Sequence, residues 1–341
     1  MTAAGLIDLT GPVRRHFDVA LTDLDGVLFR GSAPVAHAAD AVAEARKDGL
    51  QFIFITNNAS RPPKVAAAKL GSVRIPAERE DVVTAAEAGV QLMAQDIGAG
   101  ARVLVVGGNG LTEAVAKAGF KLATAAVERP AAVIQGWSPT LAWRDLEEAC
   151  YAIEAGSAYY ATNLDKNIPT EFGFAPGNGA MVQAVVATTG VRPKASGKPD
   201  PLIFRLAADR GQAVHPLVIG DRLDTDMAGA NNAGYTGLLV LTGVSTAADA
   251  LAARPAERPH LIARDLRGLG QAHRAPVEDG GYWVCGPARA WVDGNRLMVE
   301  DPDPDERGPS NQAVRAAAAA AWTAADHGVI LERESIPPEF F

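Results

Sequence analysis

The stretch that decides the fold is FDVALTDLDGVLF, residues 17–29. Its first eight residues form an apolar run bounded by a turn, which is the pattern of a buried strand. Asp23 and Asp25 stand at alternate positions where that strand ends, and Gly26 follows at once. Open α/β sheets bind ligands outside the carboxyl ends of their strands, and two close carboxylates need a cation or a shared proton to offset their charge. Surface turns rich in Asp and Gly are also common, so this segment alone favours an ordinary turn as much as a catalytic site. The rest of the chain distinguishes the two.

The composition and net charge argue against several classes of protein. With 341 residues, 48% of them hydrophobic and 21% charged, the chain is long enough for two or three domains. Its net charge of -8 argues against nucleic acid or an anionic membrane as the main partner. Two cysteines, Cys150 and Cys285, cannot form a disulfide framework or a cysteine-based zinc site, and they fit a reducing compartment. No stretch has the length of a signal-peptide core or a membrane span, so we expect a cytoplasmic protein.

Two α/β regions share the chain. Predicted strands at residues 17–24, 51–56, 216–220 and 237–241 alternate with predicted helices at 36–49, 202–210 and 227–233. A second region begins near residue 83, with predicted strands at 102–106, 131–136 and 158–163 and a predicted loop at 169–179. Sheet sequence on both sides of an independent block indicates an insertion. We expect a doubly wound parallel-sheet α/β core from residues 1–82 and 191–262, and an inserted α/β cap domain at 83–190.

The last segment, residues 263–341, predicts a small α+β extension. Asp293-Gly294 lies between two apolar segments, 288–292 and 296–299, which is a strong hairpin signal. An acidic, proline-rich loop follows. Residues 310–327, with their run of alanines, predict a helix.

Four predicted elements end in polar motifs that together suit one chemistry. The residues are Asp23 and Asp25, then Thr56 and Asn57, then Lys198, then Asp221 and Asp226. Carboxylate oxygens suit a hard cation such as Mg²⁺, whereas a threonine hydroxyl, backbone amides and a lysine suit phosphoryl oxygens. The set therefore predicts a magnesium site facing a phosphate site.

Such a site can break a phosphorus–oxygen bond. One aspartate can attack phosphorus and form an aspartyl-phosphate if Mg²⁺ and Lys198 screen its repulsion from the phosphate. The second aspartate, two residues on, can protonate the departing alkoxide and later deprotonate the attacking water. Asp224, Arg30 and Arg61 also lie near the motifs, but each is better explained as an ordinary turn or loop residue.

The ordered motifs DxDGV, TNN, GKP and GDxxxTD resemble those of haloacid dehalogenase superfamily phosphatases. The long insert between Thr56 and Lys198 resembles the NagD-like, 4-nitrophenylphosphatase branch, which carries a large α/β cap at this position. Within that branch the chain is most similar to actinobacterial glycerol 3-phosphate phosphatases. The resemblance covers the chain up to the C-terminal extension, and it implies a homodimer formed through the cap.

The resemblance also implies a role for each motif residue. Asp23 would be the nucleophile and a magnesium ligand, and Asp25 the acid/base, with its main-chain carbonyl on the metal. Asp221 would bind the metal directly, and Asp226 directly or through water. The phosphate would be held by Thr56 and Lys198, with Asn57 and the amides of residues 26–29 completing its cradle.

The cap contributes a further candidate, the loop containing Pro176, Gly177 and Asn178. Small, flexible residues allow close approach to a substrate's leaving group, so we expect this loop to bind substrate.

The expected function is a Mg²⁺-dependent phosphomonoesterase acting on a small phosphorylated metabolite, with glycerol 3-phosphate as the best candidate. A large cap that closes over the crevice favours small substrates. The alternatives are 2-phosphoglycolate, a sugar phosphate, a nucleotide or pyridoxal phosphate as substrate. A dehalogenase is disfavoured because it needs neither Asp25 nor the metal carboxylates. A non-catalytic binding or regulatory protein on the same fold is disfavoured because Asp23 and Asp25 are both present.

Overall fold

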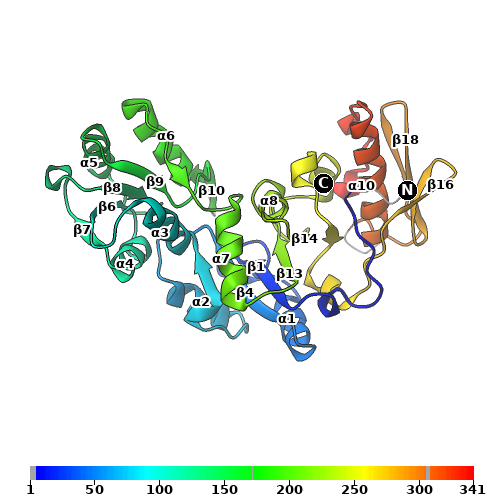
Figure 1. Ribbon diagram of the computed structural model, residues 1–341. Helices are drawn as coiled ribbons and strands as arrows, with labels where there is room; N and C mark the ends of the chain where they lie inside the picture. The colour runs from blue at the N-terminus through cyan, green and yellow to red at the C-terminus, as the bar shows by residue number, and fades with distance from the viewer. Residues whose placement is uncertain (1–4, 171, 305–307) are drawn as a thin grey trace. The chain divides into compact units, whose positions relative to one another are not determined.

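The computed structural model describes residues 5–170, 172–304 and 308–341 (Figure 1). The chain forms two compact units: unit 1 contains Met1–Phe52 and Gly211–Phe341, and unit 2 contains Ile53–Arg210. Unit 2 is therefore inserted between two segments that fold together. Within the described residues, no helix is long and apolar enough to cross a membrane.

A parallel sheet forms the centre of unit 1. Its strands are β1 (Val19–Asp23), β13 (Pro216–Gly220), β14 (Thr236–Val240) and β15 (Leu261–Ala263), in the order β15-β14-β13-β1. β1 and β13 pair in parallel from Val19 opposite Pro216 onward, and both strands are almost wholly buried. Continuous apolar runs of this kind are typical of a parallel sheet covered on both faces. The pairing brings the carboxyl ends of β1 and β13 to the same edge.

The helices of unit 1 follow these strands. Among them are α1 (Ala38–Lys47), α8 (Ala228–Ala233) and α9 (Ala247–Leu251). The sequence predicts α8 from residue 227, but a π-helical turn, Leu223–Met227, comes first. Such wider turns are often found at functional sites, and this one contains Asp226.

The C-terminal extension of unit 1 is a four-stranded antiparallel sheet packed on one long helix. The strands are β16 (Val277–Asp279), β17 (Tyr282–Cys285), β18 (Ala288–Asp293) and β19 (Arg296–Glu300), and the helix is α10 (Asn311–Asp326), red in Figure 1. Asp293 pairs with Arg296, so the turn is Gly294-Asn295, one residue later than the sequence suggests. Gly294 has φ 62°, a conformation that glycine adopts without strain.

The alanine-rich face of α10 joins this extension to the parallel sheet. Alanines 316–321 are buried in one hydrophobic cluster with Leu239 of β14 and Leu251 of α9. Trp322 is 1% exposed, and its indole N–H donates to the carbonyl of Ala250 across 2.9 Å. The short alanine side chains let backbones approach closely, so the extension is part of the core of unit 1.

Unit 2 contains a second parallel sheet covered on both faces. Its strand order is β12 (Lys194–Ala195), β9 (Ala158–Ala161), β8 (Ala132–Gln135), β6 (Arg102–Val106) and β7 (Lys121–Ala123). Helices α5 (Trp143–Glu154) and α6 (Asn178–Thr189) pack on one face, and α3 (Ala85–Asp96) and α4 (Asn109–Lys117) pack on the other (Figure 1). The predicted α/β cap fold is therefore present, whereas its boundaries at 83 and 190 stay a prediction.

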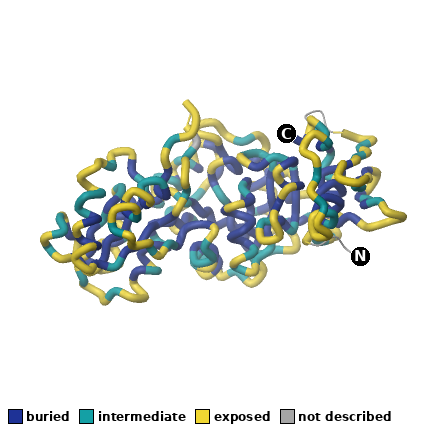
Figure 2. The backbone as a smooth tube through the Cα atoms, turned by 90° about the horizontal axis from the view of Figure 1, so that it is seen from above, coloured by how far each residue is buried: buried dark blue, intermediate teal, exposed yellow. Residues whose placement is uncertain are grey.

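The remaining elements of unit 2 lead into and out of this sheet. β4 (Gln51–Thr56) pairs in parallel with β5 (Val82–Thr84), and α2 (Pro63–Ser72) connects them. α7 (Pro201–Gly211) leads back towards unit 1. In Figure 2 the buried stretches of backbone lie in the interior of each unit, and the exposed stretches lie at its outside.

One predicted loop is wrong. Within residues 169–179, the structure has β11 (Gly173–Pro176), paired antiparallel with β10 (Asn167–Thr170), and α6 already begins at Asn178. Residue 171 lies outside the described residues. Pro and Gly are poor strand formers in a sheet interior, but an isolated two-stranded ribbon leaves one edge of each strand unpaired and tolerates them.

Candidate functional site

Three carboxylates meet at the carboxyl edge of the unit 1 sheet. Asp23 ends β1, Asp221 follows β13, and Asp226 lies in the π-helical turn; one oxygen of each lies within 4.8 Å of the others. Asp221 and Asp226 are each 1% exposed, and Asp23 is half-buried. Burying like charges together is costly unless a cation offsets them. Because every donor is an oxygen, the cluster fits a hard divalent cation such as Mg²⁺.

Glycines make room for these carboxylates. A Cβ atom on Gly26 or Gly243 would lie within 3.0 Å of the Asp221 carboxylate, and one on Gly220 would collide with Asp226. Gly26 also has φ 82°, which side chains other than glycine rarely adopt. Asp221 and Asp226 are therefore packed against glycine backbone, and they have little space in which to move.

Backbone N–H groups orient the two buried carboxylates. The N–H of Val244 donates to Oδ2 of Asp221 across 2.7 Å, and the N–H of Ser245 donates to the Asp221 carbonyl across 3.0 Å. The N–H of Arg222 donates to Oδ2 of Asp226 across 3.2 Å. Such hydrogen bonds set the direction of a metal ligand and favour its ionised form.

Asp25 lies in a tight turn just beyond β1. The N–H of Gly26 donates to the carbonyl of Phe29 across 2.8 Å, and the N–H of Leu28 donates to the carbonyl of Leu24 across 2.9 Å. Phe29 and Leu28 are buried and anchor the turn, whereas Asp25 is exposed. The side-chain cluster found among the described residues is Asp23, Asp221 and Asp226. An exposed Asp25 side chain outside it suits a group that exchanges protons.

The residues predicted to bind phosphate lie in unit 2. Thr56 ends β4, and its Oγ1 accepts a hydrogen bond from the N–H of Asn58 across 3.1 Å. Asn57 Oδ1 accepts from the N–H of Lys198 across 2.9 Å, and its Nδ2 donates to the Lys198 carbonyl across 3.3 Å. Lys198 is 5% exposed. The structure thus joins the TNN and GKP motifs, as the sequence pattern requires.

Two residues with no predicted role in the site support Asn57. The Nδ2 of Asn57 donates to Oδ2 of Asp165 across 3.1 Å, and Asn163 Nδ2 donates to the Asn57 carbonyl across 2.8 Å. Both residues follow β9, so the signal was available: polar side chains again come directly after a parallel strand. Asn57 holds the Lys198 backbone, and its predicted contact with phosphate stays a prediction.

The cap residues Pro176, Gly177 and Asn178 stand beside the same loop. Asn178 is 1% exposed, and its Nδ2 donates to the carbonyl of Asn163 across 2.8 Å. A Cβ atom on Gly177 would collide with the Asp165 carbonyl, whereas Pro176 is exposed at the end of β11. In this arrangement the Asn178 amide holds backbone, and substrate binding by the three residues stays a prediction.

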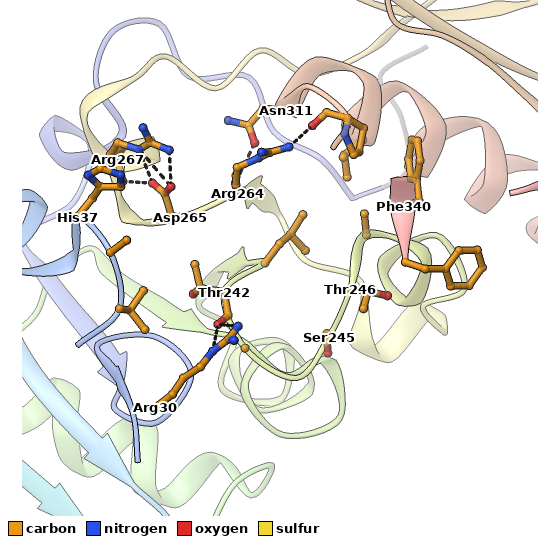
Figure 3. A pocket seen from close by; sticks show the side chains of 18 of the residues that line it. Arg30, His37, Thr242, Ser245, Thr246, Arg264, Asp265, Arg267, Asn311 and Phe340 are labelled. Atoms are coloured by element: carbon orange, nitrogen blue, oxygen red, sulfur yellow. Dashed lines mark hydrogen bonds and ion pairs between the residues drawn. The ribbon is translucent and has the colours of Figure 1, made fainter. Parts of the chain in front are cut away.

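A cavity of about 710 Å³ opens elsewhere in unit 1 (Figure 3). Arg30, Thr242, Arg264 and Phe340 are among the residues that line it, and the three clustered aspartates are not. Arg30 Nε donates to the Thr242 carbonyl across 2.7 Å. The sequence predicts no role in the site for Arg30, and the structure places it against the loop that follows β14.

Comparison with known proteins identifies the family. A haloacid dehalogenase-like hydrolase model matches residues 20–121, and a HAD-hydrolase-like model matches residues 195–269. D-glycerol 3-phosphate phosphatase from Mycobacterium tuberculosis is 41% identical over 321 residues, covering 92% of this chain and 88% of that protein. The chain belongs to the haloacid dehalogenase-like hydrolases. A 5'-nucleotidase from Bacillus subtilis is 36% identical, covering 66% of this chain and 87% of that protein.

Solved structures of other haloacid dehalogenase-like hydrolases show the same fold. Glycerol phosphate phosphatase from M. tuberculosis in complex with magnesium is similar with a TM-score of 0.84 and 40% identity, covering 92% of this chain and 93% of that one. 4-Nitrophenylphosphatase from Thermotoga maritima gives a TM-score of 0.70 and 27% identity, covering 76% and 98%. The resemblance to the 4-nitrophenylphosphatase branch is thereby confirmed.

The matched segments contain every motif residue. Asp23, Asp25, Thr56 and Asn57 lie within residues 20–121, and Lys198, Asp221 and Asp226 lie within 195–269. The similarity to the M. tuberculosis phosphatase spans 92% of the chain and so must extend into the C-terminal extension. At least some of the C-terminal extension is therefore shared with one relative. The motifs could not indicate this, because none of them lies in the extension.

Proposed function

We propose that this protein is a Mg²⁺-dependent phosphomonoesterase that hydrolyses glycerol 3-phosphate through an aspartyl-phosphate intermediate. The observation that carries the proposal is the cluster of Asp23, Asp221 and Asp226 at the carboxyl edge of the parallel sheet, with Asp25 two residues beyond Asp23. The motifs are those of the family, and the relatives named above are phosphatases and a nucleotidase.

Asp23 and Asp221, the main-chain carbonyl of Asp25, and Asp226 directly or through water would hold the magnesium ion. When bound, Mg²⁺ offsets the negative charge of the carboxylates and of the phosphoryl oxygens. The carboxylates favour this ion because every ligand atom is an oxygen. Backbone N–H donors and the rigid edge of the sheet hold the two buried carboxylates in place.

The protein's own groups would carry out the transfer in two steps. In the first, an Asp23 oxygen bonds to phosphorus while the ester P–O bond breaks, and Asp25 gives its proton to the departing alkoxide. In the second, Asp25 takes a proton from water, the water oxygen bonds to phosphorus, and the bond to Asp23 breaks. Thr56 and Lys198 would donate hydrogen bonds to the phosphoryl oxygens in both steps.

Glycerol 3-phosphate is proposed because the M. tuberculosis relative is named for it and is similar to this chain over 92% of its length, which reaches into the C-terminal extension. A nucleotide is the second candidate, since the B. subtilis 5'-nucleotidase is 36% identical, although that similarity covers only 66% of this chain. A sugar phosphate has similar support, since acid sugar phosphatases from Staphylococcus species are 32% identical, with the similarity covering 69% of this chain. 2-Phosphoglycolate, pyridoxal phosphate and a non-catalytic role have no such support among these relatives. A cytoplasmic location and a homodimer formed through the cap complete the proposal, supported by composition and by the family resemblance.

The test is phosphate release from glycerol 3-phosphate, 2-phosphoglycolate, a sugar phosphate, a nucleoside monophosphate and pyridoxal phosphate, each with Mg²⁺ or with EDTA. The wild type is compared with Asp23→Asn and with Asp279→Asn, an exposed aspartate in β16 that serves as the control. We expect metal-dependent turnover that only Asp23→Asn abolishes, with the highest kcat/KM for glycerol 3-phosphate. A folded, Mg²⁺-binding protein that releases phosphate from none of these esters would contradict the proposal.

A further inference from the structure

Two loops enclose the carboxylate of Asp221. One is the turn that contains Gly26, directly after β1, and the other is the segment that contains Gly243, directly after β14. A Cβ atom on either glycine would lie within 3.0 Å of the Asp221 carboxylate. The orientation of this aspartate therefore depends on the separation of the two loops.

Thr242 connects those loops. Its hydroxyl donates to the carbonyl of Gly26 across 2.7 Å. Its own carbonyl accepts hydrogen bonds from the guanidinium of Arg30, as Figure 3 shows, with the Nε donor 2.7 Å away. Thr242 is thus bonded through both its side chain and its backbone to the segment that carries Asp23 and Asp25.

The same loop holds Asp221 directly. Two residues beyond Thr242, the N–H of Val244 donates to Oδ2 of Asp221 across 2.7 Å. The next residue, Ser245, accepts at Oγ from the N–H of Leu223 across 3.2 Å, at the start of the π-helical turn that contains Asp226. A shift of the loop would therefore displace the donors that orient Asp221 and the first residue of that turn.

We propose that Thr242 is a positioning residue for the metal carboxylates. Its hydroxyl joins the loop after β14 to the turn after β1. This hydrogen bond keeps the distance between Asp221 and the turn that contains Asp23 and Asp25 constant. Arg30 completes the connection from the other side of Thr242. The catalytic consequence rests on the proposed function, but the effect on metal binding does not.

The segment LTGVST, residues 241–246, gave no sequence signal for this role because its residues are those of many strand-to-helix connections. The hydrogen bond that matters joins residues 216 positions apart. Groups that orient metal ligands typically change metal affinity or activity by about 10- to 100-fold when they are removed. Thr242 makes a single such bond to backbone, so we expect the lower end of that range.

The experiment measures Mg²⁺ affinity of the metal-free full-length protein by isothermal titration calorimetry. Thr242→Val removes the hydroxyl and keeps the shape, and Thr242→Ser keeps the hydroxyl. Thr189→Val is the matched control: Thr189 is also half-buried, and its hydroxyl donates to the carbonyl of Val185 across 2.9 Å in unit 2. We expect Thr242→Val to weaken Mg²⁺ binding about tenfold. Thr242→Ser and Thr189→Val should bind Mg²⁺ like the wild type.

Steady-state kinetics supply a second measurement. The Mg²⁺ concentration for half-maximal turnover should rise in Thr242→Val, whereas KM for the ester at saturating Mg²⁺ should stay within twofold of the wild-type value. Wild-type Mg²⁺ affinity in Thr242→Val, or affinity lost equally in Thr242→Ser or Thr189→Val, would overturn the proposal. Absence of ester hydrolysis by the wild type would contradict the proposed function alone, since the calorimetric comparison stands without it.

If Thr242→Val does not fold, Arg30→Gln tests the same connection from an exposed position. This variant removes the guanidinium donor to the Thr242 carbonyl. A smaller loss of Mg²⁺ affinity than that expected for Thr242→Val supports the proposal, and wild-type affinity contradicts it. A wild-type protein that binds no Mg²⁺ would overturn the role of Thr242 as well as the proposed metal site.

Discussion

The side-chain amide of Asn57 makes hydrogen bonds to both the N–H and the carbonyl of Lys198, although 141 positions separate the two residues in the chain. Oδ1 accepts from the Lys198 N–H, and Nδ2 donates to the Lys198 carbonyl. The Asn57 amide therefore fixes the position of the Lys198 backbone. Because the lysine is buried, the position of its backbone limits where its ammonium group can lie.

Replacing Asn57 by alanine should displace Lys198. We expect kcat/KM for the ester to fall about 100-fold, because small errors in the position of a catalytic group are costly. Asn58→Ala is the control, since the Asn58 side chain accepts from Ser60 and does not contact Lys198 in the hydrogen bonds described. Steady-state kinetics at saturating Mg²⁺ measure both. Equal losses in the two variants would show that the effect comes from the motif loop as a whole.

Asp226 and Asp224 should respond differently to removal of their charge. Asp226 belongs to the carboxylate cluster, whereas Asp224 accepts two hydrogen bonds from the Arg222 guanidinium. Ligand binding to the native state stabilises it, so Mg²⁺ should raise the melting temperature of the wild type. We expect Asp226→Asn to lose most of that rise and Asp224→Asn to keep it, as measured by differential scanning calorimetry with Mg²⁺ and with EDTA. If Mg²⁺ raised the melting temperature of Asp226→Asn as much as that of the wild type, Asp226 would be excluded from the metal site.

Gly243→Ala tests the packing around Asp221. The added methyl group would collide with the carboxylate, and overpacking of this kind costs about 1–3 kcal/mol. Gly71→Ala is the control, because Gly71 lies in α2 with no atom close to its would-be Cβ, and alanine favours helix there. Urea unfolding and Mg²⁺ titration should show losses of stability and affinity only in Gly243→Ala. If that variant kept wild-type Mg²⁺ affinity, the carboxylate would have room to move.

Trp322 should be a major stabilising residue of unit 1. It is 1% exposed, its N–H donates to Ala250, and the Arg258 guanidinium lies 5.4 Å from the centre of its ring. Trp322→Ala should lower the free energy of unfolding by about 3–5 kcal/mol. Trp143, 74% exposed in α5, should tolerate alanine within about 0.5 kcal/mol. Urea unfolding checks both values, and a small effect at Trp322 would show that the extension packs loosely on α9.

Stability should fall in mild acid through His273. Burial, and then the nearby charge of Arg315, lower the pKa of His273 to about 3 from its ordinary 6.5. Its Nδ1 contacts the Ile7 carbonyl and its Nε2 accepts from the Ile262 N–H, which requires the neutral ring. Since the unfolded chain takes up the proton first, stability present above pH 6.5 is lost as the pH falls towards 3.

Between pH 7 and pH 5 this histidine should cost the native state about 2 kcal/mol. His273→Gln should show a smaller loss over the same interval, and the exposed His16→Gln should match the wild type. His260, whose pKa burial also lowers, keeps part of the dependence in every variant. Urea unfolding at the two pH values gives the comparison. An unchanged slope in His273→Gln would mean that His273 is protonated in the native state.

Local patterns in the sequence were sufficient for the central strands of the two parallel sheets and for the polar residues that follow them. β4, β6 and β13 have the predicted bounds, since short apolar runs between turn residues have few alternatives to a buried strand. The hairpin β10–β11 was missed because its proline and glycine content is typical of a loop, and only pairing between its strands makes it a ribbon. The π-helical turn before α8 was also missed, since its composition is that of an ordinary helix start.

The sequence by itself determined which residues can be proposed for the chemistry of this protein. Asp23, Asp25, Thr56, Lys198, Asp221 and Asp226 could be chosen because polar groups at the ends of parallel strands have a known use. The tertiary structure alone decided how those groups are held. Thr242 beside Gly26, Asn57 beside Lys198, and Asn178 beside Asn163 are each paired through hydrogen bonds between segments distant in the chain. Such pairs depend on which strands become neighbours, and that depends on burial of the whole core.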